Sequence, residues 1–236
     1  MMKYRSITAA ALTACILTTA SGQADIIVDV QDTTITAGGT GTVDVLISSN
    51  GLSTDQFDFA SYVFGITPVG SPSTTLQFAD PQSTTESGLG TYVFAADLAA
   101  GGLDFIVNDP AEVEGSDFTD TGSLITLSGT QQLLAQLDLE HLPPGAGLGA
   151  GDQFRITLVN TSAFGGSDTE FLDGITPATI DADSFNPLGV GGGLITVTSA
   201  AVPEPGTFAL SGIAVLAGAV HNRRKKRLVV DEATSL

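Results

Sequence analysis

Short runs of β-branched and aromatic residues alternate with turn-forming residues from Asp25 to Ala201. Val, Ile, Thr, Phe and Tyr suit the half-buried surface of a sheet, whereas Gly, Pro, Asp, Ser and Asn favour turns. Many short strands separated by turns predict an all-β fold, built as a single β-sandwich or jelly roll. Strands are predicted at residues 26–30, 42–48, 57–66, 75–78, 92–95, 105–107, 124–127, 133–139, 154–158 and 194–198.

Two stretches of the same region also suit short helical turns. One covers residues 99–102, and the other covers residues 131–137, where it competes with the predicted strand. Side chains alternate between the two faces of a strand, and this alternation places Phe57, Phe59 and Val63 toward the core. No internal repeat is evident in the sequence.

Charge is distributed very unevenly along the 236-residue chain, whose net charge is −18. The segment from Asp25 to Ala201 has 23 acidic residues and one basic residue, Arg155, and so carries a net charge of −22. Nucleic acid is excluded as a partner, because binding it requires Lys and Arg side chains that neutralise phosphates. Such a charge makes the protein repel itself, and salt screens this repulsion. We therefore expect a saline extracellular setting.

The first 24 residues are typical of a secretory signal peptide. Lys3 and Arg5 form a positively charged start, and an apolar stretch covers residues 7–20. Gly22 and Ala24 are small residues at the two positions that a signal peptidase reads. Cleavage is therefore predicted after Ala24.

The single cysteine offers an alternative N-terminus. Residues 12–15 fit a lipobox, in which case Cys15 would be lipidated and would start the mature chain. Ile16 and Leu17 continue the apolar run where lipoproteins usually turn polar, and this favours the plain signal peptide. No cysteine follows Cys15, so a disulfide is excluded from the domain.

The C-terminal part has three elements in sequence. Residues 206–220 form an uncharged apolar run, which as a helix would be roughly 22 Å long. It is shorter than the roughly 20 residues of a permanent span, and this favours a transient transmembrane helix. The run follows Val202, Pro203, Glu204 and Pro205, whose prolines keep the chain extended. It precedes a basic cluster that should stay in the cytoplasm, made of Arg223, Arg224, Lys225, Lys226 and Arg227.

This three-part tail resembles the PEP-CTERM sorting signal of bacteria. The resemblance covers residues 202–227 and implies an exported protein that is held in the inner membrane and then processed by an exosortase. Its destination would be the cell surface or the extracellular space. Residues 228–236 follow the basic cluster, whereas in the family the cluster usually ends the chain. The alternative is an ordinary membrane anchor that is never cut.

The region between the two terminal segments resembles the cohesin-type β-sandwich. The resemblance covers residues 25–201 and rests on Val43–Ile47, Asp55–Phe59, Tyr62, Leu134–Leu139, Gly151–Leu158 and Gly193–Val197, in that order. It implies the fold and a binding role. Cohesins bind dockerin modules through one sheet face, and no dockerin-like repeat occurs in this chain. Another Ig-like or lectin-like sandwich stays open.

Residue types restrict the catalytic chemistry. His141 is the one histidine between Asp25 and Ala201, and Leu142 and two prolines follow it, so we expect an exposed loop histidine. A Ser–His–Asp triad could use this residue only. Paired carboxylates are abundant, so a glycoside hydrolase stays an alternative, but the sequence singles out no pair. We predict that the protein is not an enzyme.

Calcium is the cofactor that best suits an acidic loop, because it takes carboxylate and carbonyl oxygens. One candidate loop contains Asp168, Glu170 and Asp173, and a second contains Asp181 and Asp183. The second loop begins like an EF-hand, but it has Phe185 at the fifth position and lacks glycine at the sixth. Solvated loop acids are the simpler interpretation, and no cofactor is required.

The sequence predicts an exported, non-catalytic structural, adhesive or protein-binding module. A polysaccharide-binding module is the alternative, although the chain has no Trp and the domain only two Tyr on which sugar rings could stack.

Overall fold

The computed structural model describes residues 25–50, 55–97, 102–143, 145, 148–164, 168–174, 176–185 and 192–199. The structure divides the chain into two units, residues 1–198 and 199–236. The signal peptide, the sorting segment with its apolar run and almost all of the helical turn predicted at residues 99–102 lie outside the described residues. Within the described part of the chain, no helix has the length and hydropathy needed to cross a membrane.

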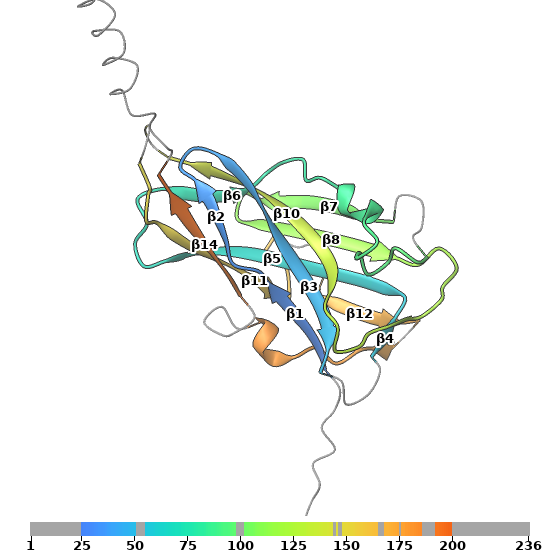
Figure 1. Ribbon diagram of the computed structural model, residues 1–236. Coiled ribbons are helices and arrows are strands. Elements are labelled where there is room, and N and C mark those ends of the chain that lie inside the picture. The colour runs from blue at the N-terminus through green and yellow to red at the C-terminus, as the bar shows by residue number, and fades with distance from the viewer. Residues whose placement is uncertain are drawn as a thin grey trace, which may run out of the picture. The chain divides into compact units, whose positions relative to one another are not determined.

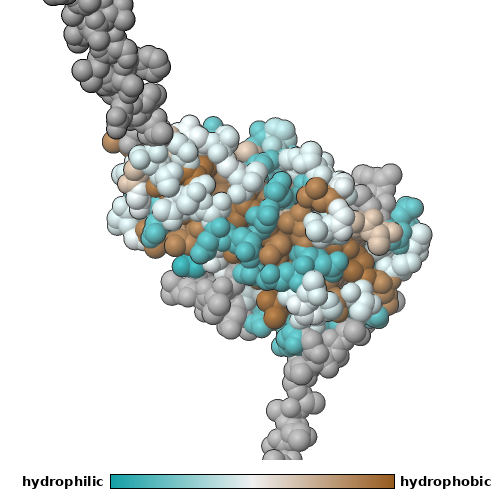
Figure 2. All heavy atoms as spheres, in the orientation of Figure 1, coloured by the Kyte–Doolittle hydropathy of each residue, from teal (hydrophilic) through white to brown (hydrophobic). Residues whose placement is uncertain are grey.

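The first layer of the sandwich is an antiparallel sheet of four strands (Figure 1). Its strand order is β1-β3-β10-β6. Hydrophilic side chains cross this face of the molecule, with hydrophobic ones beside them (Figure 2). The bounds are β1 Ile26–Val30, β3 Thr40–Ser49, β10 Gln132–Leu142 and β6 Thr75–Phe78.

The second layer is an eight-stranded sheet whose main path runs β13-β12-β5-β11-β14-β2. Two further strands lie off this path, where β8 pairs with β5 and β7 pairs with β8. All pairs are antiparallel except β14 with β2. The bounds are β2 Thr33–Thr36, β5 Phe59–Val69, β7 Asp104–Asp109, β8 Glu112–Phe118, β11 Gln153–Val159, β12 Glu170–Asp173, β13 Thr176–Pro177 and β14 Gly193–Thr198.

Three smaller elements complete the described fold. A short ribbon joins β4, Gln56–Phe57, to β9, Ile125–Thr126. Two 3₁₀ turns are η1, Thr85–Gly88, and η2, Ala182–Phe185.

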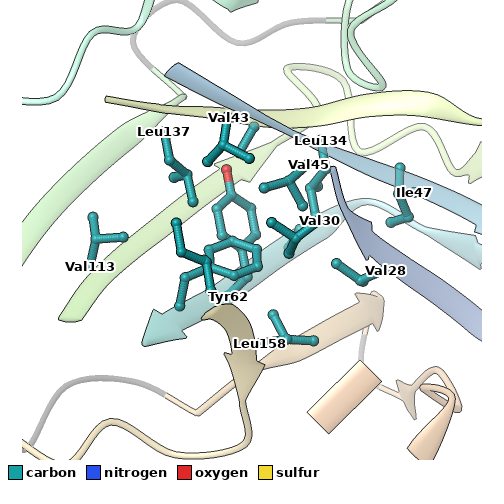
Figure 3. Close-up of a cluster of buried hydrophobic side chains, with 14 of the residues drawn as sticks. Val28, Val30, Val43, Val45, Ile47, Tyr62, Val113, Leu134, Leu137 and Leu158 are labelled. Carbon is teal, nitrogen blue, oxygen red and sulfur yellow. The ribbon is translucent and has the colours of Figure 1, made fainter. Parts of the chain in front are cut away.

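The core lies between the two sheets (Figure 3). Alternate residues of β1 and β3 point inward, because side chains on a strand alternate between its faces. Tyr62 of β5 is fully buried in the middle of the core, and Figure 3 shows its hydroxyl pointing toward Val43 and Leu137 of the first sheet. Its register partner on β8 is Gly115, where an added Cβ atom would overlap the Tyr62 ring. Glycine at this position therefore makes room for the ring.

Most predicted strands are confirmed, and residues 26–30 and 75–78 match β1 and β6 at both ends. Residues 131–137 do not form a helical turn, because β10 runs through them. The prediction at residues 92–95 is wrong, since only Tyr92 makes an isolated bridge there and turns follow it. Residues 57–66 are interrupted at Asp58, so Phe59 is only partly buried, whereas Phe57 and Val63 are buried as predicted.

Candidate functional site

The outer face of the four-stranded sheet collects carboxylates and amides, and we call it the acidic face. Burial alternates along its strands, and the outward positions are Asp29, Thr42, Asp44, Gln77, Gln136, Asp138 and Glu140. Hydrophilic side chains dominate this band in Figure 2. The acidic face therefore gathers acids from three neighbouring strands, β1, β3 and β10.

Glutamine amides, and not cations, bond the carboxylates of the acidic face. Gln136 Nε2 donates to Asp44 Oδ1 at 2.8 Å, and Gln77 Nε2 donates to Glu140 Oε2 at 3.1 Å. An amide satisfies an acceptor without adding charge. Arg155, the one basic residue of the domain, lies on β11 in the other sheet, where Nη1 donates to the carbonyl of Gly192 at 2.9 Å. The acidic face therefore keeps its negative charge.

One acid of this face also holds an element in place. Asp138 Oδ2 accepts a hydrogen bond from the backbone nitrogen of Ser83 at 3.0 Å. Gln82 bonds the backbone of Asp138 on both sides, since its Oε1 accepts from the nitrogen at 2.7 Å and its Nε2 donates to the carbonyl at 2.9 Å. β6 pairs only with residues 139–142 of β10, so these bonds fix the segment 79–97 along the remaining edge of β10.

His141 is not an exposed loop residue, and the prediction is wrong. It lies near the end of β10, 1% exposed. Its Nδ1 accepts a hydrogen bond from the backbone nitrogen of Gly38 at 2.9 Å, and its Nε2 lies 2.8 Å from Thr74 Oγ1. The Thr74 hydroxyl in turn donates to Asp152 Oδ2 at 2.6 Å. The two prolines that follow Leu142 suggest that the strand ends before His141. In the structure β10 continues to Leu142 and includes the histidine.

These bonds define one proton arrangement. Because Nδ1 of His141 accepts, its proton sits on Nε2 and is donated to Thr74. Burial lowers the pKa of His141, and the Asp152 carboxylate opposes this shift. The hydrogen bond from Thr74 lowers the pKa of Asp152.

The order of groups differs from a catalytic triad. In a triad the imidazole lies between the hydroxyl and the carboxylate and takes the hydroxyl proton. Here the hydroxyl of Thr74 lies between His141 and Asp152 and gives its proton to the carboxylate. Gly149 packs against both Thr74 and His141, so closely that an added Cβ would lie 2.9 Å from His141 Cε1. The network joins the ends of β6 and β10 to the turn before β11.

A second buried polar cluster contains Tyr62, Glu86, Tyr92 and Asp117. The hydroxyl of Tyr92 donates to Asp117 Oδ2, and Glu86 Oε1 accepts from the backbone nitrogen of Gln136 at 3.2 Å. Tyr62 Oη and Glu86 Oε2 are buried without a hydrogen-bond partner. Burial raises the pKa of both Glu86 and Asp117. The sequence showed these acids only as members of a polar loop and of an unrecognised strand.

The calcium candidates are distributed over separate elements. Asp168 is exposed and bridges to Thr161, while Glu170 and Asp173 lie three positions apart on β12, so their side chains leave opposite faces. Asp181 precedes η2, and Asp183 lies within it. Among the residues that the structure describes, no group of three or more His, Cys, Asp or Glu side chains could hold a metal ion. Calcium binding stays a prediction.

A groove of about 760 Å³ lies beside β1. It is lined by Ile27, Val28, Asp29, Ser48, Ser49, Asn50, Gly129, Gln131, Asp181 and Ser184. This lining offers carboxylate, hydroxyl and amide groups and contains no aromatic ring.

Comparison with known proteins identifies the tail. A family model described as the PEP-CTERM protein-sorting motif matches residues 201–225. This match includes the residues that the sequence analysis singled out, from Val202 to Pro205 and from Arg223 to Lys225. No curated protein matches the sequence.

Solved structures that resemble the chain include cohesin modules. The third ScaC cohesin of Acetivibrio cellulolyticus, solved with the ScaB dockerin, is 14% identical, with a TM-score of 0.44, over 73% of this chain and 99% of that one. A type III cohesin of the ScaE scaffoldin of Ruminococcus flavefaciens is 13% identical, with a TM-score of 0.44, over 78% of this chain and 93% of that one. Similarity of this degree identifies no binding partner. The part of the chain that the structure describes is thus an all-β domain, and the chain carries a PEP-CTERM sorting motif near its C-terminus.

Proposed function

We propose that this protein is exported, sorted through its C-terminal motif and released by an exosortase to the cell surface or extracellular matrix. The match of the PEP-CTERM motif to residues 201–225 carries this proposal. The signal peptide predicted at residues 1–24 supports the same route, since it directs the chain to the secretory pathway.

The β-sandwich then acts as a non-catalytic structural, adhesive or protein-binding module. Its acidic face is the surface best suited to binding, because acids from three strands lie at its outward positions without a neighbouring cation. Sheet faces and edges are common protein-binding surfaces, and charge complementarity steers their association. A partner with a basic surface fits this face, and a dockerin-like module is one candidate.

The sorting step is tested on the mature protein in its native cells by fractionation and intact mass. We expect a chain that ends near residues 202–205 and lies outside the inner membrane. Exchanging Pro203 and Glu204 for Ala should leave the tail attached and the protein in the membrane fraction. A wild-type chain that keeps residues 223–236 in the membrane would contradict the exosortase step and would indicate a permanent anchor.

The binding role is tested by returning purified protein to cells from which it has been stripped. Replacing Asp29, Asp44 and Glu140 by Asn, Asn and Gln removes three charges and keeps similar shapes. We expect weaker rebinding of this variant, and weaker rebinding of the wild type at higher salt. A matched variant with Asp104, Asp120 and Asp168 changed to Asn removes the same charge elsewhere and should rebind like the wild type. Equal loss in both variants would assign the effect to total charge.

A polysaccharide-binding module is the second candidate, and the groove beside β1 favours it. Its carboxylates and amides can bond sugar hydroxyls, although it lacks an aromatic ring for stacking. Replacing Asn50 by Ala should then reduce binding on a glycan array without changing rebinding through the acidic face, because Asn50 lines the groove and is not part of that face.

A further inference from the structure

The start of β1 is held on both of its edges. The carbonyl oxygen of Asp25 accepts a hydrogen bond from the backbone nitrogen of Asn50 at 3.2 Å. On the other edge, the nitrogen of Ile26 donates to the carbonyl of Thr179 at 2.9 Å, and the nitrogen of Asp181 donates to the carbonyl of Ile26 at 2.8 Å. The backbone of Asp25 therefore has a defined position.

A shielded carboxylate lies beside this strand end. β1 pairs Ile26 with Ser49, and the side chain of Ser49 bonds Asp55. The Oδ2 atom of Asp55 is shielded from solvent and has no hydrogen-bond partner. Burial raises the pKa of Asp55, and the nearby Asp25 carboxylate raises it further, while the Ser49 bond opposes the shift. A shielded carboxylate oxygen is destabilising unless a group donates to it.

No basic side chain of the domain is available as that donor. Between Asp25 and Ala201 the sequence contains no lysine, and its one arginine, Arg155, bonds Gly192 on the other sheet. Signal peptidase would supply a different cation. Hydrolysis of the Ala24–Asp25 peptide bond consumes one water and leaves a carboxylate on Ala24 and an amine on Asp25, which is protonated below a pKa of about 7.7–8.0.

The backbone places this amine at the end of β3, where Asp55 is bonded. Within a strand, the nitrogen and the carbonyl of one residue point to the same side, and the Asp25 carbonyl points to Asn50 at the end of β3. Asp55 is tied to the same end of β3 through Ser49. In this antiparallel pairing the nitrogen of Asp25 faces the carbonyl of Asn50, at the end of β3 to which Asp55 is tied. An ammonium group has two further N–H donors, and these can reach the unpartnered oxygen.

We propose that the α-ammonium group created on Asp25 by signal-peptide removal is the partner of Asp55, so that maturation completes an ion pair at the start of β1. The domain then reaches its full stability only after export. This inference rests on the proposed export route and on cleavage after Ala24.

The test uses the mature chain secreted from its host, with intact mass confirming that Asp25 is the first residue. Acetic anhydride removes the charge of the α-amine, and a mature chain that ends near residues 202–205 contains no lysine, so it has no other amine. We expect acetylation at pH 6.5 to lower the melting temperature by about 2–4 °C, the shift that loss of one such interaction gives in a domain of this size. In Asp55→Asn the same acetylation should have no effect. Asp120→Asn, at an exposed position, should respond like the wild type.

A pH series gives an independent readout. The ion pair should raise the pKa of the α-amine, so its stabilisation is complete below about pH 7.7 and is lost as the pH rises through the folded-state value. The acetylated chain should lack this loss. An equal melting shift in wild type and Asp55→Asn would overturn the ion pair. A mature chain that starts elsewhere would also overturn it, whereas the sorting proposal is judged separately at the C-terminus.

Discussion

At the scale of single residues, the protein depends on a few positions where size or hydrogen bonding leaves no alternative. Gly115 and Thr74 are two of them. Gly115 makes room for the ring of Tyr62, and Thr74 connects His141 to Asp152. Neither residue belongs to an apolar run, so the sequence pattern does not predict that either is important for the core.

Replacing Gly115 by Ala should destabilise the domain by about 1–3 kcal/mol, the usual effect of overpacking a core. The added Cβ overlaps the Tyr62 ring, which is fully buried and cannot move away freely. The free energy of unfolding in urea measures the effect. Gly90→Ala is the control, because an added Cβ there meets no atom within 4 Å. Equal stability of both variants would contradict the tight packing around Tyr62.

Replacing Thr74 by Val should cost about 1–3 kcal/mol, because it leaves a buried ring nitrogen of His141 without a partner. It also removes a hydrogen bond from Asp152. The next residue, Thr75, is exposed at the start of β6, so Thr75→Val is a matched control that should stay close to the wild type. If both variants unfold at the same urea concentration, the hydrogen-bond network of Thr74 contributes little to the stability of the domain.

At the scale of elements, the segment 79–97 replaces a strand along part of one sheet edge. β10 has eleven residues, whereas β6 pairs with only its last four. Gln82, Glu86 and Val93 bond the rest of that edge. The segment also places Tyr92 and Phe94 in the core, so one stretch of irregular chain both covers the sheet edge and fills the gap between the sheets.

Replacing Gln82 by Ala should loosen this segment locally. The backbone nitrogen of Asp138 loses its acceptor, so we expect its amide hydrogen to exchange faster. Gln77→Ala removes a glutamine from the acidic face and should leave the Asp138 amide unchanged. Amide exchange followed by NMR compares the two variants. Unchanged exchange at Asp138 in Gln82→Ala would show that the segment is held by its apolar contacts alone.

At the scale of the whole molecule, charge is the dominant property. The domain carries a net charge of −22. Two of its acids, Glu86 and Asp117, are buried near Tyr62 and Tyr92. The negative charges of Asp44 and Asp138 further raise the pKa of Glu86. Self-repulsion and the burial of these acids both oppose the ionised folded state. Stability is therefore coupled to pH and to salt.

Stability should fall as the pH rises above about 4.5, the ordinary pKa of a glutamate. Burial raises the pKa of Glu86 and Asp117 in the folded state above their ordinary values of 4.5 and 3.8. The folded state then holds protons more tightly than the unfolded state, and this stabilisation is lost as the pH rises through the folded pKa. Urea unfolding at several pH values measures the slope. Glu86→Gln should reduce the dependence of the unfolding free energy on pH. Glu140→Gln, on the outer sheet face, should change this dependence less. The same pH dependence in both variants would contradict a role for burial.

The sequence alone determined the all-β class, most strand positions and the sorting tail, because these depend on local patterns. Alternating apolar residues place β1 and β6, and the order of the Pro-Glu-Pro box, apolar run and basic cluster is readable without a fold. Only the tertiary structure decided the rest. β8 contains Glu112, Gly115 and Asp117, so its sequence has no apolar run that predicts a strand. It forms a strand because it pairs with β5 and β7. His141 and Asp55 obtain their surroundings from residues distant in the sequence, and the environment of a polar group depends on what packs against it.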